Sequence, residues 1–345
     1  MCGMNKKLKI GILGCANIAE KYAINAFKAI NNAEVVGIAS RDPEKAKKWA
    51  SRFNIRAEQS YDAMIASSGI DAVYIPLPIG LHEEWVIGAA SAGKHIICEK
   101  SLTDSFDSAL KIIESCRSNG VVLYENFMSD FHPQHEKVLA SIKSGKIGRP
   151  FVFRSNFGFN LSDKHNFRFD KKLGGGSLND EGAHLVFMAR KIFGEEPITV
   201  TCNLLHKKAD GVDIQGSAML EFPEARTALL AFSYCSEYQN NYSVWGSQGI
   251  INVASAYSIA PRVRPSLSLI KIENYKEVVT DIKVLVANQF ELIFHDFCDT
   301  VLNKGKRAKK IASIYKQILA QAKVLEAMRR SSVENRKVVV NEIRD

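Results

Sequence analysis

The chain has 345 residues, a formal net charge of +9, 46% hydrophobic residues and 24% charged residues. Hydrophobic cores stop growing near ~250–300 residues, so this length predicts two domains. No apolar stretch approaches the ~20 residues that a transmembrane helix needs, which excludes a membrane span. The short, lysine-bearing N-terminus lacks the apolar region of a signal peptide, which predicts a cytoplasmic protein.

The seven cysteines are scattered, with no C-x-x-C pair and no histidine at metal spacing. This distribution predicts reduced thiols and no metal site. The positive charge suits nucleic acid, and it equally suits a pocket for a phosphorylated cofactor and an acidic substrate. The basic cluster at residues 304–310 has no interleaved aromatic residues. We therefore expect a solvated loop there and no nucleic-acid partner.

Strands and helices alternate along the first 125 residues. Apolar patterns predict strands at 8–14, 34–40, 72–76, 95–98 and 121–124, with helices at 17–30, 43–53, 82–92 and 105–119. Alternation at this spacing implies right-handed βαβ units and a parallel, doubly wound sheet. We expect residues 1–125 to form a dinucleotide-binding Rossmann domain.

Strands dominate after residue 127. They are expected at 151–159, 198–203, 214–222, 226–233, 242–246, 250–254 and 338–340, with helices at 134–144, 178–193, 287–303 and 310–330. Short turns between successive strands favour an antiparallel sheet. Residues 126–345 are therefore predicted to form an α/β substrate and oligomerisation domain with a large, mostly antiparallel open sheet. The C-terminal helices are candidates to pack back on the first domain.

The turn after the first strand carries the expected dinucleotide-binding residues, Gly14, Cys15, Ala16, Asn17 and Ile18. A turn that follows a strand and opens a helix is the context of the dinucleotide fingerprint. Only the first glycine of that fingerprint is literal, because alanines replace the second and third. The context nevertheless predicts that this turn binds the cofactor pyrophosphate.

The second strand ends in Ser40 and Arg41, where an NAD-binding protein would carry a carboxylate for the ribose diol. Arg41 offers a planar donor fork and Ser40 a hydroxyl, which suit the 2′-phosphate of NADP(H). NADP(H) is therefore the preferred cofactor. In the alternative, Asp42 turns inward to bind the diol of NAD(H) while Arg41 points to water.

The third strand leads into Pro76, Leu77 and Pro78 at the carboxyl edge of the sheet, where α/β sheets bind ligands. Two prolines make a rigid wall with few donors, which suits a flat ring. We count these three residues as cofactor-binding candidates, together with His82, Glu99, Lys100 and Arg168.

Lys100 follows the next strand, so it should emerge at the same edge. An ammonium there can stabilise the negative charge that grows on a carbonyl oxygen during hydride transfer. Asp180 and His184 are four residues apart on a predicted helix and should share a face. His184 can transfer a proton while Asp180 orients its ring or binds a substrate hydroxyl. The alternative is a helix-terminal aspartate beside a core histidine.

Together these residues resemble the Gfo/Idh/MocA oxidoreductase family over nearly the whole chain. The motifs lie at residues 11–16, 74–78 with 81–85, 92–100, and 174–178 leading to Asp180. The resemblance implies a Rossmann domain followed by an open, mostly antiparallel sheet that supplies a substrate pocket and often an oligomer interface. The family's Glu-Lys-Pro motif reads Glu99-Lys100-Ser101 here, which assigns the catalytic lysine to Lys100. Its second acid/base position, tyrosine in sugar ketoreductases and histidine in inositol dehydrogenases, is His184.

Residues 237–249 and 261–265 look like those of nucleotide-sugar 3-ketoreductases from deoxysugar pathways. Candidate substrate contacts are Asn126, Asp180, His184 and Tyr242, although Tyr242 and Trp245 equally fit packing on the back of the sheet. The expected function is NADPH-dependent reduction of a nucleotide-linked keto-deoxysugar by a homo-dimer or homo-tetramer. One rival is an NAD(P)-dependent dehydrogenase of free polyols, aldoses or dihydrodiols. Another is a catalytically inactive NADP-sensing regulator.

Overall fold

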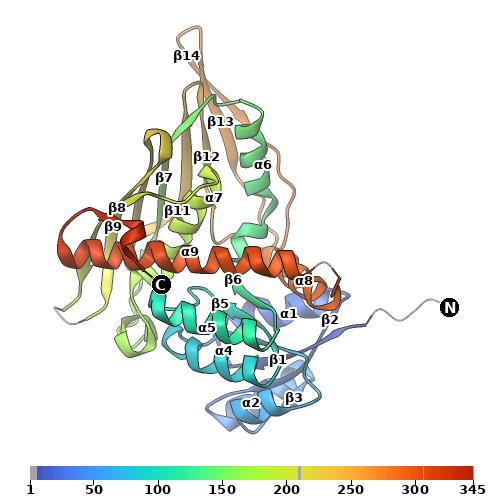
Figure 1. Cartoon of the computed structure of the whole chain (residues 1–345). Coiled ribbons are helices and arrows are strands. Elements are labelled where there is room, and N and C mark those ends of the chain that lie inside the picture. The colour runs from blue at the N-terminus through green and yellow to red at the C-terminus, as the bar shows by residue number, and fades with distance from the viewer. Residues whose placement is uncertain (1–5, 209–210, 306, 345) are drawn as a thin grey trace. The chain divides into compact units, whose positions relative to one another are not determined.

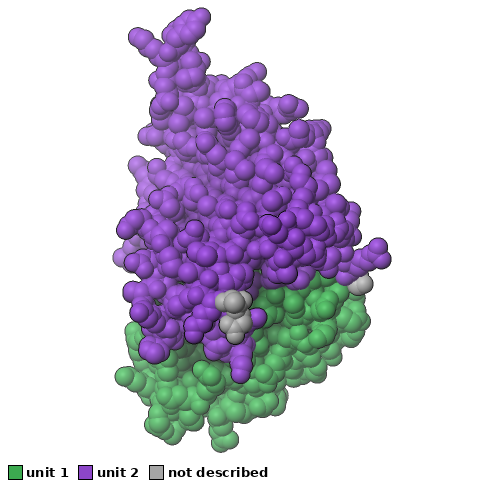
Figure 2. Space-filling view, turned by 90° about the vertical axis from the view of Figure 1, so that its left-hand side faces the viewer, with its two compact units in different colours: residues 1–128, 290–319 green, residues 129–289, 320–345 purple. Residues whose placement is uncertain are grey.

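The computed structural model describes residues 6–208, 211–305 and 307–344, so Cys2 and Lys306 lie outside the described residues. The chain forms two compact units, distinguished by colour in Figure 2. Unit 1 comprises residues 1–128 and 290–319, and unit 2 comprises residues 129–289 and 320–345. The long helix α9 (Arg307–Glu334) contributes to both units.

Unit 1 is built on a six-stranded parallel sheet in the order β3-β2-β1-β4-β5-β6 (Figure 1). The strands are β1 (Leu8–Leu13), β2 (Ala33–Ala39), β3 (Arg56–Ala57), β4 (Ala72–Ile75), β5 (His95–Glu99) and β6 (Leu123–Asn126). The strand order reverses between β1 and β4, which is the position where doubly wound sheets bind ligands at their carboxyl ends. The predicted Rossmann sheet is confirmed.

Helices cover both faces of this sheet. They are η1 (Ala19–Ala23), α1 (Ile24–Ala29), α2 (Pro43–Phe53), α3 (Tyr61–Ala66), α4 (His82–Ser91), α5 (Phe106–Ser118) and α8 (Gln289–Leu302). Side chains alternate along β4, so Val73 and Ile75 enter the core formed with α3, α4 and α5. Tyr74 faces the other way, toward Phe27 of α1 and Phe294 of α8. The 290–319 segment thus supplies part of the unit 1 core.

Three local features of unit 1 differ from the sequence prediction. The helix expected at 17–30 begins with a π-helical turn over 19–23. The strand expected at 121–124 lies at 123–126, because its pairing with β5 begins at Leu123. The short elements β3 and α3 were not predicted, since two and six residues are too few for a clear apolar period.

Unit 2 contains a nine-stranded sheet in the order β14-β13-β12-β11-β7-β10-β9-β8-β15. The strands are β7 (Pro150–Asn160), β8 (Thr199–His206), β9 (Asp213–Phe222), β10 (Arg226–Ser233), β11 (Cys235–Gly246), β12 (Gly249–Val253), β13 (Leu267–Glu273), β14 (Lys276–Asp281) and β15 (Val338–Val339). Within this second sheet, β7 and β10 are the only described strands that pair in parallel. The predicted mostly antiparallel sheet is confirmed, and its helices include α6 (Pro133–Lys143) and α7 (Ala183–Phe193).

The hairpin of β13 and β14 was not predicted. Every residue of β14 is exposed, so this strand lacks the alternation of buried and exposed residues that reveals a half-buried strand. Figure 1 shows the hairpin extending away from the remainder of the sheet.

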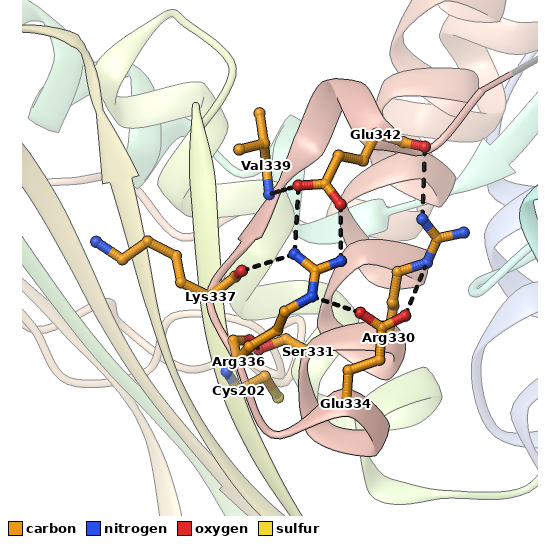
Figure 3. A network of polar contacts seen from close by, with 8 residues as sticks. All are labelled: Cys202, Arg330, Ser331, Glu334, Arg336, Lys337, Val339 and Glu342. Carbon is orange, nitrogen blue, oxygen red and sulfur yellow. Dashed lines mark hydrogen bonds and ion pairs between the residues drawn. The ribbon is translucent and has the colours of Figure 1, made fainter.

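The C-terminus closes the other edge of the sheet, where β15 pairs with β8. Arg336 binds the carboxylates of Glu334 and Glu342 (Figure 3). The hydroxyl of Ser331 accepts from the Cys202 amide at 2.9 Å and donates to the Arg336 carbonyl at 2.6 Å. These contacts hold α9 and the terminal strand against the sheet.

The six described cysteines are free thiols, and four of them are buried: Cys98, Cys116, Cys202 and Cys298. Among the described residues, no helix is both long and apolar enough to cross a bilayer.

Candidate active site

The turn after β1 has the conformation that a dinucleotide-binding turn requires. Gly14 has a φ of +123°, and a Cβ added there would lie 2.8 Å from Cδ2 of Leu77. The backbone conformation therefore favours glycine, and a larger residue would also displace the end of the Leu77 side chain. Cys15, Ala16, Asn17 and Ile18 follow, and helix η1 begins at Ala19. The predicted turn residues lie together between the carboxyl ends of β1 and β4.

The end of β2 carries Ser40 and Arg41, followed by Asp42. The Oδ1 atom of Asp42 accepts from the amides of Glu44 and Lys45 at 3.0 and 3.2 Å, so this carboxylate caps the N-terminus of α2. Capping occupies the group that the NAD alternative needs for a ribose diol. Arg41 is exposed, and the binding of a phosphate by Arg41 and Ser40 stays a prediction.

Lys45 is a candidate that sequence reasoning missed. Its Nζ donates to the Cys15 carbonyl at 2.9 Å, which places an ammonium between the turn and the end of β2. Burial raises the pKa of the Cys15 thiol, while a hydrogen bond with Ser40 and the charge of Lys45 lower it. The signal in the sequence is a cation in the first turn of the helix that follows Arg41.

The segment Pro76, Leu77 and Pro78, here called the proline wall, leaves β4 at the same carboxyl edge. His82 opens α4 and is fully buried. Its Nε2 lies 2.8 Å from the Leu77 carbonyl, and its Nδ1 lies 3.1 Å from the carbonyls of Ser101 and Leu102. Burial lowers the pKa of the imidazole. The side chain expected to bind cofactor thus connects two backbone loops.

Glu99 joins the ends of three neighbouring strands. Its Oε1 accepts from the Tyr74 hydroxyl at 2.6 Å and from Nδ2 of Asn126 at 2.6 Å. Burial raises the pKa of Glu99, against the lowering effects of these donors and of Lys100. Asn126, a candidate substrate contact, is fully buried in this network. Lys100 follows directly at the carboxyl end of β5, and its peptide bond to Ser101 is cis.

The triple glycine of unit 2 shapes the start of the helix that carries Asp180 and His184. Gly176 has a φ of +122°, and a Cβ there would overlap Oδ1 of Asp213. Asp213 accepts from the hydroxyl of Ser177 at 2.8 Å and the amide of Leu178 at 2.7 Å. The helix predicted at 178–193 is π-helical over 178–182 before α7 begins, so the spacing of a regular α-helix does not apply across this junction.

Asp180 forms an ion pair with Nε of Arg168, and the Tyr234 hydroxyl donates to the same carboxylate at 3.4 Å. Asp180 raises the pKa of Arg168, the residue predicted to bind cofactor. His184 is buried, and its ring lies 5.5 Å from the rings of Phe157 and Tyr257. Lys100 belongs to unit 1 and this group to unit 2. Their common action therefore stays a prediction.

Tyr242 lies in the core of unit 2, where its hydroxyl is 2.8 Å from Nδ1 of His135. Trp245 is three residues further along β11 and faces the opposite side of the sheet, with 44% of its surface exposed. Substrate contact by Tyr242 stays a prediction.

Comparisons with known proteins agree with this architecture. The model described as an oxidoreductase family with an NAD-binding Rossmann fold matches residues 8–127, and the GFO/IDH/MocA C-terminal domain model matches residues 135–252. The chain belongs to the GFO/IDH/MocA family. It is therefore an oxidoreductase with an NAD-binding Rossmann domain, and the resemblance stated from its motifs is confirmed.

Three relatives within the GFO/IDH/MocA family are informative. The dTDP-3,4-didehydro-2,6-dideoxy-α-D-glucose 3-reductase of Saccharopolyspora spinosa is 36% identical, with 74% of this chain and 77% of the relative covered. The D-xylose 1-dehydrogenase (NADP(+)) 2 of Haloferax volcanii is also 36% identical, with 76% and 80% covered. The crystal structure of KijD10, a 3-ketoreductase from Actinomadura kijaniata in complex with NADP and TDP-benzene, has a TM-score of 0.88 at 30% identity, with 94% and 98% covered.

Proposed function

We propose that this chain reduces the keto group of a nucleotide-linked deoxysugar with NADPH, in the cytoplasm. The observation that carries the proposal is the position of Lys100. Lys100 follows β5, and the Gly14 turn follows β1 in the same parallel sheet. Both therefore lie at the carboxyl edge of that sheet. An ammonium at this edge is suited to stabilise a developing alkoxide.

The residues of unit 1 fit a dinucleotide with a 2′-phosphate. A Cβ at Gly14 would fill the space against Leu77 that the backbone turn leaves open. Ser40, Arg41 and Lys45 would hold the 2′-phosphate, because Asp42 is engaged at the helix N-terminus. When bound, the reduced nicotinamide supplies the hydride. NAD(H) is the alternative cofactor.

The proposed reaction gives each predicted catalytic side chain a separate role. Lys100 stabilises negative charge on the substrate oxygen, and His184 donates a proton to it. Asp180, held by Arg168, binds a substrate hydroxyl or orients the imidazole. The rings of Phe157 and Tyr257 exclude water from the His184 imidazole.

The substrate assignment rests on the relatives. The 3-reductase similarity and the NADP and TDP-benzene complex of KijD10 support a dTDP-linked keto-deoxysugar. The D-xylose dehydrogenase supports the rival, a dehydrogenase of free aldoses or polyols, which would use the same site chemistry. Assays of NADPH oxidation with dTDP-linked 3-ketosugars and of NADP⁺ reduction with D-xylose separate the two functions. Inactivity in both would favour the regulatory rival.

The first experiment replaces Lys100 with alanine. We expect turnover to fall by about 10³-fold or more because a preorganised charge is lost, while NADPH affinity changes little. The control is Lys111→Ala, because that ammonium is exposed and pairs with Glu83 on the surface. Unchanged turnover in Lys100→Ala would remove this lysine from the mechanism.

The same proposal includes a homo-oligomer formed through the open face of the unit 2 sheet. Residues paired across five strands form an apolar row on this face, consisting of Val152, Trp245, Ile250, Ile270 and Val279. Trp245 and Val279 are 44% and 56% exposed, which is unusual for large apolar residues in a contiguous row. Light scattering should show a dimer or tetramer that dissociates in Trp245→Glu. A monomeric wild-type chain at micromolar concentration would contradict this part.

A further inference from the structure

The loop after β5, residues 100–103, has no regular secondary structure, yet it is buried from residue 101 onward. Ser101, Leu102 and Thr103 are 1%, 2% and 5% exposed. Buried backbone groups need hydrogen-bond partners, so the partners of this loop identify what holds it in place.

Two side chains from outside the loop supply these partners. The Leu102 amide donates to Oε1 of Glu125 on β6 at 2.8 Å. The carbonyls of Ser101 and Leu102 each lie 3.1 Å from Nδ1 of His82. Glu125 therefore holds the loop from the neighbouring strand, while His82 holds it from α4.

His82 also connects this loop to the proline wall, because its Nε2 lies 2.8 Å from the Leu77 carbonyl. One fully buried ring therefore fixes the spacing between the loop that carries Lys100 and the loop that lies against Gly14. Burial lowers the pKa of this imidazole, so the ring is neutral and carries one N–H. It therefore donates to one of the two loops and holds the other by packing against it.

We propose that Glu125 and His82 are positioning residues that set the location of Lys100 relative to the cofactor turn. This inference rests on the catalytic role proposed for Lys100. Glu125 acts through the length of its side chain, which brings Oε1 to the Leu102 amide. A displacement of about 1 Å at a catalytic group is enough to lower a rate by ~10²-fold.

A matched pair of variants tests the role of Glu125. Glu125→Gln keeps the acceptor at the same reach without the charge, and Glu125→Asp keeps the charge but withdraws the acceptor by one methylene. We expect Glu125→Gln to retain kcat within about threefold and Glu125→Asp to lose roughly 10–100-fold, with NADPH affinity preserved in both. The opposite ranking would show that charge matters, and would overturn the proposal.

Hydrogen exchange gives a readout that does not depend on turnover. The Leu102 amide should lose protection in Glu125→Asp and keep it in Glu125→Gln. Equal protection in the two variants would overturn the positioning role even if no substrate is turned over. Wild-type turnover that survives Lys100→Ala would instead contradict the proposed function, so the two failures are distinguishable.

His82→Leu tests the second positioning residue, and His95→Leu is its control. His95 lies at the opposite end of β5, where its Nδ1 accepts from the Val122 amide at 2.9 Å. His82→Leu should lower kcat by ~10-fold or more and also weaken NADPH binding, because Leu77 loses its partner. His95→Leu should leave both quantities within about threefold. Equal effects of the two variants on kcat would contradict a specific role for His82.

Discussion

At the scale of single residues, the proposed phosphate site consists of Ser40 and Arg41 after β2 and Lys45 in α2. Ser40 and Arg41 were found from the sequence, while Lys45 was found only from its contact with the Cys15 carbonyl. Asp42 could have bound a ribose diol, but its carboxylate accepts two amides of α2. These contacts favour a phosphate over a diol at this position.

Replacing Lys45 with methionine tests this arrangement. A hydrogen bond from a charged donor contributes about 1.5–3 kcal/mol, so the Kd for NADPH should rise by roughly tenfold or more. The Kd for NADH should change little, because NADH has no 2′-phosphate. Fluorescence titration measures both values, and Lys47→Met is the control because Lys47 pairs with Glu44 on the surface. A parallel loss of affinity for both cofactors would place Lys45 elsewhere in the site.

At the scale of secondary structure elements, the start of the Asp180 helix depends on the triple-glycine turn. Gly176 has a positive φ and lies against Asp213, whose carboxylate receives the first donors of the helix. Gly194, at the other end of α7, also has a positive φ, but a Cβ there would meet nothing within 4 Å. Comparing substitutions at Gly176 and Gly194 therefore distinguishes the cost of backbone strain from the cost of steric overlap.

Gly194→Ala should cost about 1 kcal/mol of unfolding free energy, because only the backbone conformation is disfavoured. Gly176→Ala should cost more than ~2 kcal/mol, because Asp213 must also move and the helix loses its cap. Urea unfolding monitored by circular dichroism compares the two variants. Equal costs would show that the approach to Asp213 contributes nothing to stability.

At the scale of the whole molecule, both units contain histidines that folding keeps neutral. Burial lowers the pKa of His95 in unit 1 to about 4 and that of His135 in unit 2 to about 3. The unfolded chain binds protons at these histidines near pH ~6.5. Below that pH the unfolded chain binds more protons than the folded chain, so stability falls as pH falls.

The free energy of unfolding should therefore decrease between pH 7 and pH 5 by a few kcal/mol in total, at about 1.4 kcal/mol per pKa unit, and the urea midpoint should decrease with it. The carboxylates whose pKa values are lowered by donors, such as Glu83 and Glu221, lose their contribution only below pH ~4.5. Between pH 6.5 and pH 5 the histidines destabilise the fold as pH falls, against the opposite effect of Glu99, whose pKa is raised by burial. A constant midpoint across that window would contradict the burial of these imidazoles in neutral form.

The parts of the fold that the sequence predicted are those with a strong apolar period. The unit 1 strands β1, β2, β4 and β5 are buried on both sides, and each appeared as a short apolar run. Strand β14 was not predicted because all of its residues are exposed, so it has no alternation of buried and exposed positions. The π-helical start at 178–182 was not predicted either, and its first donors bind Asp213, which is 33 residues away from Asp180 in the chain.

By itself, the sequence determined the family and identified the candidate residues Gly14, Lys100 and His184. It also predicted a dinucleotide-binding domain followed by a domain with a mostly antiparallel sheet. These follow from local patterns, in which neighbours along the chain define a strand, a turn or a helix face. Only the tertiary structure showed which other residues contact the predicted site. Lys45 binds the Gly14 turn, and Arg168 pairs with Asp180. His82 and Glu125 contact the loop at residues 100–103. Such contacts depend on distances between segments far apart in sequence, which no local pattern records.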